Sequence, residues 1–84
     1  GFPKFFTPRK NGKNDFWQIK GAGLQPDSKV EIYNRYGKLI QELTPNMQGW
    51  DGTYKGNLMP SNDYWFKALL QDGRVIYDHF SLVR

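Results

Sequence analysis

The chain has 84 residues, is 17% aromatic, carries a formal charge of +4 and contains no cysteine. One domain of this length, residues 1–84, buries only about two-thirds of the surface of its unfolded chain, so bulky aromatic side chains must supply most of the core. The missing cysteines exclude disulfides, thiolate catalysis and cysteine-based metal sites, and the scattered basic residues do not require a nucleic acid as partner.

The first 20 residues predict two strands with a basic loop between them. Pro3 in the apolar segment 1–6 is typical of an edge strand, where a missing amide costs no ladder hydrogen bond. Residues 15–20 alternate between apolar and polar side chains, which is the pattern of a half-buried strand. The loop at residues 9–14 carries three cations, whose repulsion argues against a calcium ion bound there, and we expect neither a metal nor a cofactor.

A hairpin is predicted around the turn at residues 34–37, whose last residue is a glycine suited to a left-handed backbone conformation. In the strand before the turn, around residues 29–33, the apolar side chains point to one face, whereas Glu31 and Tyr33 point to the other. Residues 38–43 return antiparallel to this strand.

A second hairpin is predicted from two strands at residues 64–71 and 74–83, joined by the Asp-Gly pair at residues 72–73. The expected core positions of its last strand are Ile76, Phe80 and Leu82, and Asp78 is the charged residue between them on that face. Six or seven short strands separated by turns, with no helical apolar spacing, predict an all-β fold. We expect a small antiparallel, immunoglobulin-like β-sandwich.

A loop of fixed shape is predicted just before the strand at residues 64–71, because turn-forming residues lie between large aromatics there. Its glycines can take positive φ, its proline fixes its own φ, and its asparagine is expected in a left-handed conformation. These structural residues are Trp50, Asp51, Gly52, Gly56, Pro60 and Asn62.

Residues with catalytic potential are few. His79 is the only histidine, and its phase in the last strand predicts a surface position. The aspartates lie at turns or strand starts, where they accept hydrogen bonds from nearby amides. We therefore expect that the chain is not an enzyme.

The three tryptophans raise a second possibility. Trp17 and Trp50 are expected in the core of so small a domain. Trp65 alternates opposite to the buried positions of its strand and is the best candidate for a sugar-binding surface. A carbohydrate-binding module is thus an alternative function, and a nucleic-acid-binding barrel a more distant one.

Five segments, in order, resemble the gliding-motility-associated C-terminal domain, which is the type B sorting domain of the type IX secretion system. The segments are Phe6–Pro8 with Asn11–Asp15, Val30–Lys38, Trp50–Gly52 with Gly56 and Pro60, Tyr64–Phe66, and Phe80–Arg84. Two departures stand out: the usual acidic loop after the first segment is basic here, and a glycine of the family is replaced by Asn62.

The resemblance implies a C-terminal signal that directs a large cargo, carried N-terminally on the same chain, through the outer-membrane translocon of a gram-negative bacterium. The cargo would pass through the periplasm to the cell surface or the medium. The resemblance further implies that an outer-membrane barrel protein recognises the folded domain, with no nucleic acid and no membrane-spanning segment involved.

The residues that contact this partner are predicted from exposure. The last strand is expected to offer an open backbone edge with a cationic tip, which suits strand addition, and Arg84 is the first candidate. Arg35 and Tyr36, in the exposed hairpin turn, are the second.

Overall fold

The computed structural model describes residues 2–8, 15–19, 28–70 and 72–84, and these residues contain strands and turns but no helix. The all-β prediction is therefore confirmed, while the predicted basic loop at residues 9–14 lies outside the described residues. The strands are β1 (Phe5–Phe6), β2 (Lys29–Tyr33), β3 (Leu39–Leu43), β4 (Thr53–Tyr54), β5 (Asn57–Leu58), β6 (Asn62–Leu69) and β7 (Val75–Leu82).

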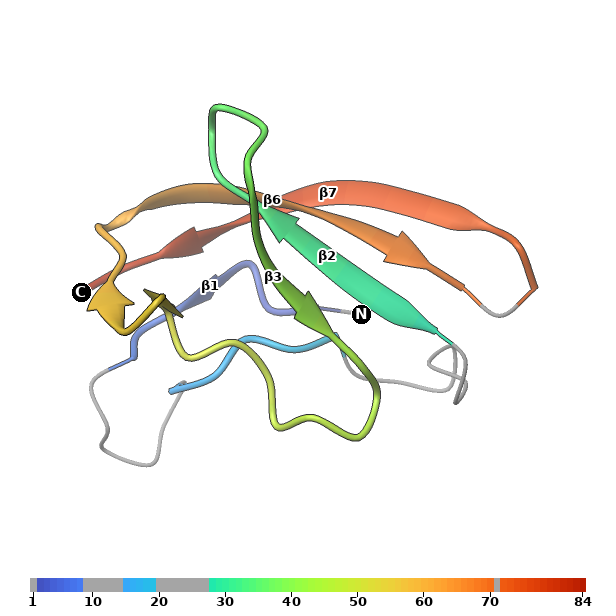
Figure 1. The fold of residues 1–84 in the computed structure, drawn as a ribbon, viewed down its shortest axis with the longest axis horizontal. Coiled ribbons are helices and arrows are strands. Elements are labelled where there is room, and N and C mark those ends of the chain that lie inside the picture. Colours follow the sequence, from blue (N-terminus) through green and yellow to red (C-terminus); the bar gives the residue numbers. More distant parts are fainter. Residues whose placement is uncertain (1, 9–14, 20–27, 71) are drawn as a thin grey trace.

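Five strands form one sheet in the order β1-β7-β6-β2-β3 (Figure 1). The hairpins β2–β3 and β6–β7 are antiparallel, as predicted, and β6 also pairs antiparallel with β2. β1 lies at the edge, also as predicted, but it pairs parallel to β7, with Phe5 opposite Ser81. The sheet is thus mixed rather than antiparallel, because the first and last strands of the chain run side by side in the same direction.

A second layer covers one face of this sheet, here called the inner face, and makes the fold compatible with a small β-sandwich (Figure 1). It contains the two-stranded sheet β4–β5 and an isolated antiparallel bridge in which Trp17 and Trp50 exchange backbone hydrogen bonds of 2.9 Å. Of the strand predicted at residues 15–20, the structure describes residues 15–19, which contain only this bridge. One reason is that the Gln18 side chain occupies neighbouring backbone groups, accepting from the Ile19 N–H and donating to the Thr44 carbonyl.

The core between the layers is built mainly from aromatic rings. Trp17 and Trp50 are buried, as predicted, with 0% and 2% exposure. The Trp17 ring stacks on Phe80 with centroids 4.0 Å apart and lies 5.0 Å from Phe66. Each such ring removes on the order of 150 to 250 Å² from water, which explains how a chain of this length sustains a packed core.

The strand phases follow the predicted alternation, with local exceptions. Val30 and Ile32 are buried. A register shift in the β2–β3 pair buries both Ile40 and Leu43, although three positions separate them. Ile76 was expected in the core but is 45% exposed, because it lies near the β6–β7 turn, away from the aromatic cluster.

Candidate functional site

The predicted loop of fixed shape begins with Trp50 and Asp51. The Trp50 indole Nε1 donates to the Thr53 carbonyl at 2.8 Å. The Asp51 carboxylate accepts from the Thr53 amide at 3.1 Å and from its hydroxyl at 2.7 Å. Gly52 has a φ of 85°, a conformation that disfavours residues with a Cβ. The residues Trp50 to Gly52 therefore form a turn held by side chains, as the sequence predicts.

The tip of this loop is the β4–β5 hairpin, whose two connecting residues both have positive φ, 52° at Lys55 and 83° at Gly56. Two such residues are the requirement of a type I′ turn, which matches the twist of a tight hairpin. Asn62 was expected in a left-handed conformation, and this prediction was wrong. Asn62 instead begins β6, and its side chain accepts from the Asp63 amide.

The end of the loop is tied to the core through Tyr64. Its hydroxyl donates to the Pro60 carbonyl at 2.9 Å, and the ring is buried. Burial raises the pKa of Tyr64 above its ordinary value near 10. The phenol is therefore held in its neutral, hydrogen-bond-donating form.

Replacing Tyr64 by phenylalanine should lower the free energy of unfolding by about 0.5 to 1.5 kcal/mol at neutral pH, because the hydrogen bond to Pro60 is lost. The pKa of Tyr64 is higher in the folded protein than in the unfolded chain. Its contribution to stability is therefore complete below about pH 10 and declines as the pH rises through the folded-state pKa. Denaturant titrations of both proteins at pH 7 and pH 11 measure this. A stability difference that grows between these pH values would contradict it.

Arg84, the first candidate for partner contact, is turned toward the shaped loop. Its guanidinium donates from Nε to the Met59 carbonyl at 2.6 Å and from Nη2 to the Gly52 carbonyl at 2.8 Å. Its amide donates to the Ser61 hydroxyl. The side chain thus joins two ends of the loop and brings the predicted loop residues together with β7.

The open edge expected at the end of the last strand is not present there. β7 is an internal strand, and β1 covers its final residues: the Ser81 amide donates to the Lys4 carbonyl and the Val83 amide to the Phe6 carbonyl. Strand addition at this end of β7 was therefore a wrong prediction. Sequence order alone did not reveal that residues 5–6 occupy the position beside it.

Arg35 and Tyr36, the second candidates, lie on the turn between β2 and β3, which projects from the sheet (Figure 1). The Asn34 side chain fixes this turn by accepting from the amides of Tyr36 and Lys38, and Gly37 has the predicted positive φ of 80°. Tyr36 is 78% exposed, and Arg35 donates to its hydroxyl at 2.6 Å. Both residues remain accessible to a partner.

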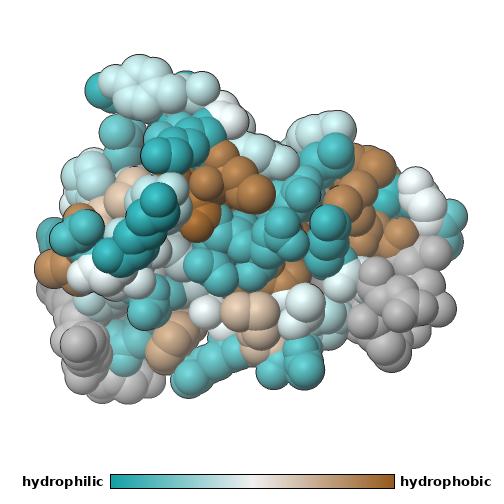
Figure 2. All heavy atoms as spheres, viewed as in Figure 1, coloured by the Kyte–Doolittle hydropathy of each residue, from teal (hydrophilic) through white to brown (hydrophobic). Residues whose placement is uncertain are grey.

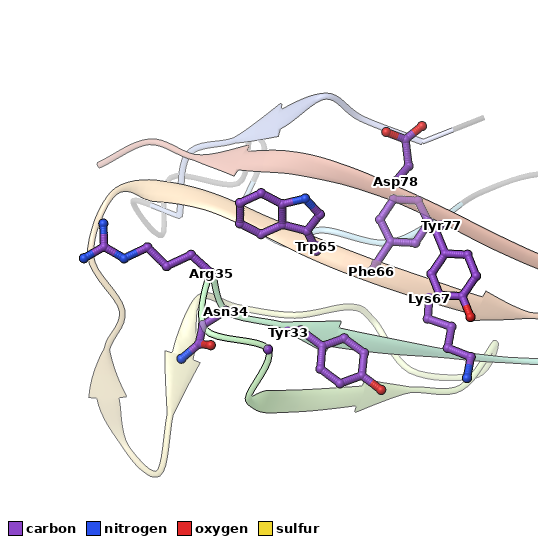
Figure 3. A pocket seen from close by; sticks show the side chains of 9 residues that line it. Tyr33, Asn34, Arg35, Trp65, Phe66, Lys67, Tyr77 and Asp78 are labelled. Carbon is purple, nitrogen blue, oxygen red and sulfur yellow. The ribbon is translucent and has the colours of Figure 1, made fainter.

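A hollow of about 440 Å³ lies beside this turn on the other face of the sheet, here called the outer face. Figure 3 shows the side chains around it coming from three neighbouring strands and the turn. The residues that line the hollow include Tyr33, Asn34, Arg35, Trp65, Lys67 and Tyr77. Figure 2 shows a dip in the outline of the molecule. The protruding turn lies on one side of the dip, and hydrophobic side chains gather on the other side, toward the far end of β6 and β7.

The acidic groups near the hollow have partners of their own. The Tyr33 hydroxyl donates to Glu31 at 2.9 Å, which raises the pKa of Tyr33, and Glu31 also pairs with Lys29. Asp78 accepts from the His79 amide, and its side chain points away from Tyr77 (Figure 3). Within the described residues, neither Arg35 nor Lys67 forms an ion pair.

Other ligand chemistry has little support in the part of the chain that the structure describes. No group of three or more potential metal-ligating side chains occurs there. His79 is exposed, as predicted, with its ring 6.2 Å from that of Trp65. Within the same residues, no helix is long and apolar enough to cross a membrane.

Comparison with protein families matches residues 1–80 to the CHU_C type IX secretion signal domain. The chain belongs to this family. The suspected type B sorting domain is thereby confirmed, and the CHU_C domain serves as an export signal within a larger cargo chain, sent to the cell surface or the medium. No curated protein and no solved structure matched the chain.

Sequence reasoning found only part of the hollow of this CHU_C domain. It placed Trp65 on the outward side of its strand, and the structure confirms this with 42% exposure. It missed Lys67 and Tyr77 as neighbours of Trp65, although their phases in β6 and β7 carry the same signal. The predicted hairpin turn at residues 72–73 could have given the pairing of Lys67 with Tyr77, whereas the pairing of β2 with β6 was not available from the sequence.

Proposed function

We propose that this domain is read in its folded form by an outer-membrane barrel protein of the type IX secretion system, which passes the attached cargo from the periplasm to the outside. The family match supports the export role. The observation that supports reading of the folded form is the burial of the last strand. Phe80 and Leu82 are each 1% exposed in the core, and β7 lies between β1 and β6.

An extended-peptide signal would require a different arrangement. A receptor that binds residues 80–84 as a free strand must first separate β7 from both neighbours and expose its aromatic contacts. That separation costs a large part of the free energy of unfolding, because β7 is paired on both sides and its side chains fill the core. Recognition of a surface of the intact domain avoids this cost.

The test is export of a fluorescent reporter fused between a signal peptide and residues 1–84 in a bacterium with a type IX system. Most of the reporter should reach the surface or medium, and a host without the translocon should retain it in the periplasm. A matched fusion with Trp50→Ala, shown by circular dichroism to be unfolded at the growth temperature, should also be retained. Equal export of the folded and unfolded fusions would refute reading of the folded form.

A carbohydrate-binding module remains the second candidate, because the outer face presents Trp65 together with Tyr33 and Tyr77. Trp65 is the exposed tryptophan, whereas Trp17 and Trp50 are buried, so its fluorescence reports on this face. Quenching by a soluble polysaccharide at millimolar sugar concentration, lost in Trp65→Phe, would favour this function. An unchanged spectrum is expected from a sorting domain.

A further inference from the structure

We infer that the outer-face hollow is the surface on which the export machinery recognises the folded domain, and that its occupant is an acidic protein segment with an apolar side chain beside a carboxylate. This inference rests on the proposed function and adds to it the site of contact and the chemistry of the partner.

Exposed aromatic side chains make up much of the hollow. Tyr33, Trp65 and His79 face one another across β2, β6 and β7, and Lys67 and Tyr77 form the next cross-strand pair. Trp65 is 42% and Tyr77 70% exposed. Tryptophan, tyrosine and arginine are the residue types that contribute most binding energy at protein interfaces. Their presence in one hollow is typical of an interaction surface.

Among the described residues, the two cations of the hollow form no ion pair. Arg35 borders it at the turn, and Lys67 lies across it with Nζ 5.9 Å from the Tyr77 ring centroid. Of the carboxylates nearby, Glu31 is engaged by Tyr33 and Lys29, and Asp78, which also lines the hollow, accepts from the His79 amide and points away from Tyr77 (Figure 3). Two cations against one carboxylate leave the lining with a positive balance, and charge complementarity selects an acidic occupant.

The cations and rings of this surface are paired at two places. At the turn, the Arg35 guanidinium lies over the Tyr36 ring, 4.9 Å from its centroid, and on the strands Lys67 lies over the Tyr77 ring. Alternate side chains of an extended protein segment point to the same face, so one segment can place an apolar group on a ring and a carboxylate on the adjacent cation. We therefore commit to a protein segment as the occupant.

The other candidate surface, at Arg84 and the end of β7, is already occupied within the domain. The Arg84 guanidinium is bonded to the Gly52 and Met59 carbonyls, and β1 pairs with the end of β7. Arg35 and Tyr36 are both exposed on the turn, and Arg35 also lines the hollow. The accessible candidates thus lie at the outer face.

The experiment uses the reporter fusion described above with Trp65→Ala and with the double charge reversal Arg35→Glu and Lys67→Glu. Each variant should reduce the ratio of surface to periplasmic reporter by about tenfold or more, as expected for loss of an interface anchor. The control is Lys4→Glu, a single charge reversal at an exposed lysine outside the hollow, which should export like the parent. Thermal melts of the purified domains should agree within a few degrees.

The outcomes separate the two proposals. If the parent fusion is retained in the periplasm, the proposed function fails and this inference fails with it. If the parent is exported and the charge-reversed variant, with an unchanged melt, is exported equally, only the inference fails. The charge-reversed variant leaves the core intact and decides the question even if Trp65→Ala loses stability. If polygalacturonate, an acidic polysaccharide, quenches Trp65 in the parent domain, the occupant is a glycan and the protein segment is rejected.

Discussion

Replacing Trp50 by alanine should lower the free energy of unfolding by roughly 3 to 5 kcal/mol, the range for truncating a large buried aromatic. Its ring contacts Tyr64 and Phe6 with centroids 5.1 and 5.7 Å away, and its indole nitrogen donates to Thr53. Its backbone pairs with Trp17, which is itself stacked on Phe80. Truncation therefore removes the contact between the shaped loop and the core.

The measurement is a urea titration followed by circular dichroism. The matched control is Trp65→Ala, the same chemical change at an exposed position, which should change stability by at most about 1 kcal/mol. A Trp50→Ala protein that unfolds at the same urea concentration as the parent would show that this ring does not anchor the loop. Because domains of this size are marginally stable, the expected loss is enough to unfold much of the population at growth temperature.

The second large effect is expected from Arg84→Ala, which should lower the free energy of unfolding by about 1.5 to 3 kcal/mol, the range for hydrogen bonds that involve a charged group. The guanidinium reaches two carbonyls in different parts of the loop, those of Met59 and Gly52. Its end also lies close to Gly52, where an added Cβ would be 3.1 Å from Nη2. Alanine leaves both carbonyls without this donor.

Arg84→Lys is the matched control, because a lysine keeps the charge but lacks the planar fork that spans two acceptors. It should recover only part of the lost stability. If both variants melt like the parent but fail in reporter export, Arg84 contacts the partner instead of stabilising the loop. Loss of stability in Arg84→Ala, with partial recovery in Arg84→Lys, supports the structural role.

Much of the fold follows from local patterns in the sequence. The alternation around Val30 and Ile32, and around Tyr64 and Phe66, correctly gives the buried faces of β2 and β6. The turns at residues 34–37 and 72–73 form where glycine permits positive φ, at Gly37 and Gly73. These features depend on neighbours within a few residues, so the sequence carries them directly.

The features that the sequence did not reveal depend on distant residues. The parallel pairing of Phe5 with Ser81 joins segments from opposite ends of the chain. Residues 15–19 have the alternation of a strand, but only Trp17 finds a ladder partner, at Trp50. The expected left-handed residue was Asn62, whereas the hairpin β4–β5 places this conformation at Lys55. In each case tertiary pairing overrides the local preference.

The candidate site was likewise predictable where it depends on nearby residues and not where it depends on distant ones. The outward phase of Trp65 was predictable, and so was the exposed turn with Arg35 and Tyr36. The hollow itself arises from the register between β2, β6 and β7, which sets Tyr33 beside Trp65 and Lys67 beside Tyr77. The short turn of the β6–β7 hairpin sets the second of these pairs, whereas β2 and β6 are separated by a long connection, so their register cannot be read from the alternation of each strand alone.

The pairing of β1 with β7 has a consequence for timing. Because Phe5 and Phe6 lie beside Ser81 and Leu82, the sheet can be completed only after residues 5 to 82 have all been synthesised. Contacts between residues so far apart in sequence also form slowly. A fragment released early lacks the closing strand, so the native surface is assembled only on chains whose synthesis has reached Leu82. In this way the topology couples formation of the sheet to the presence of both β1 and β7.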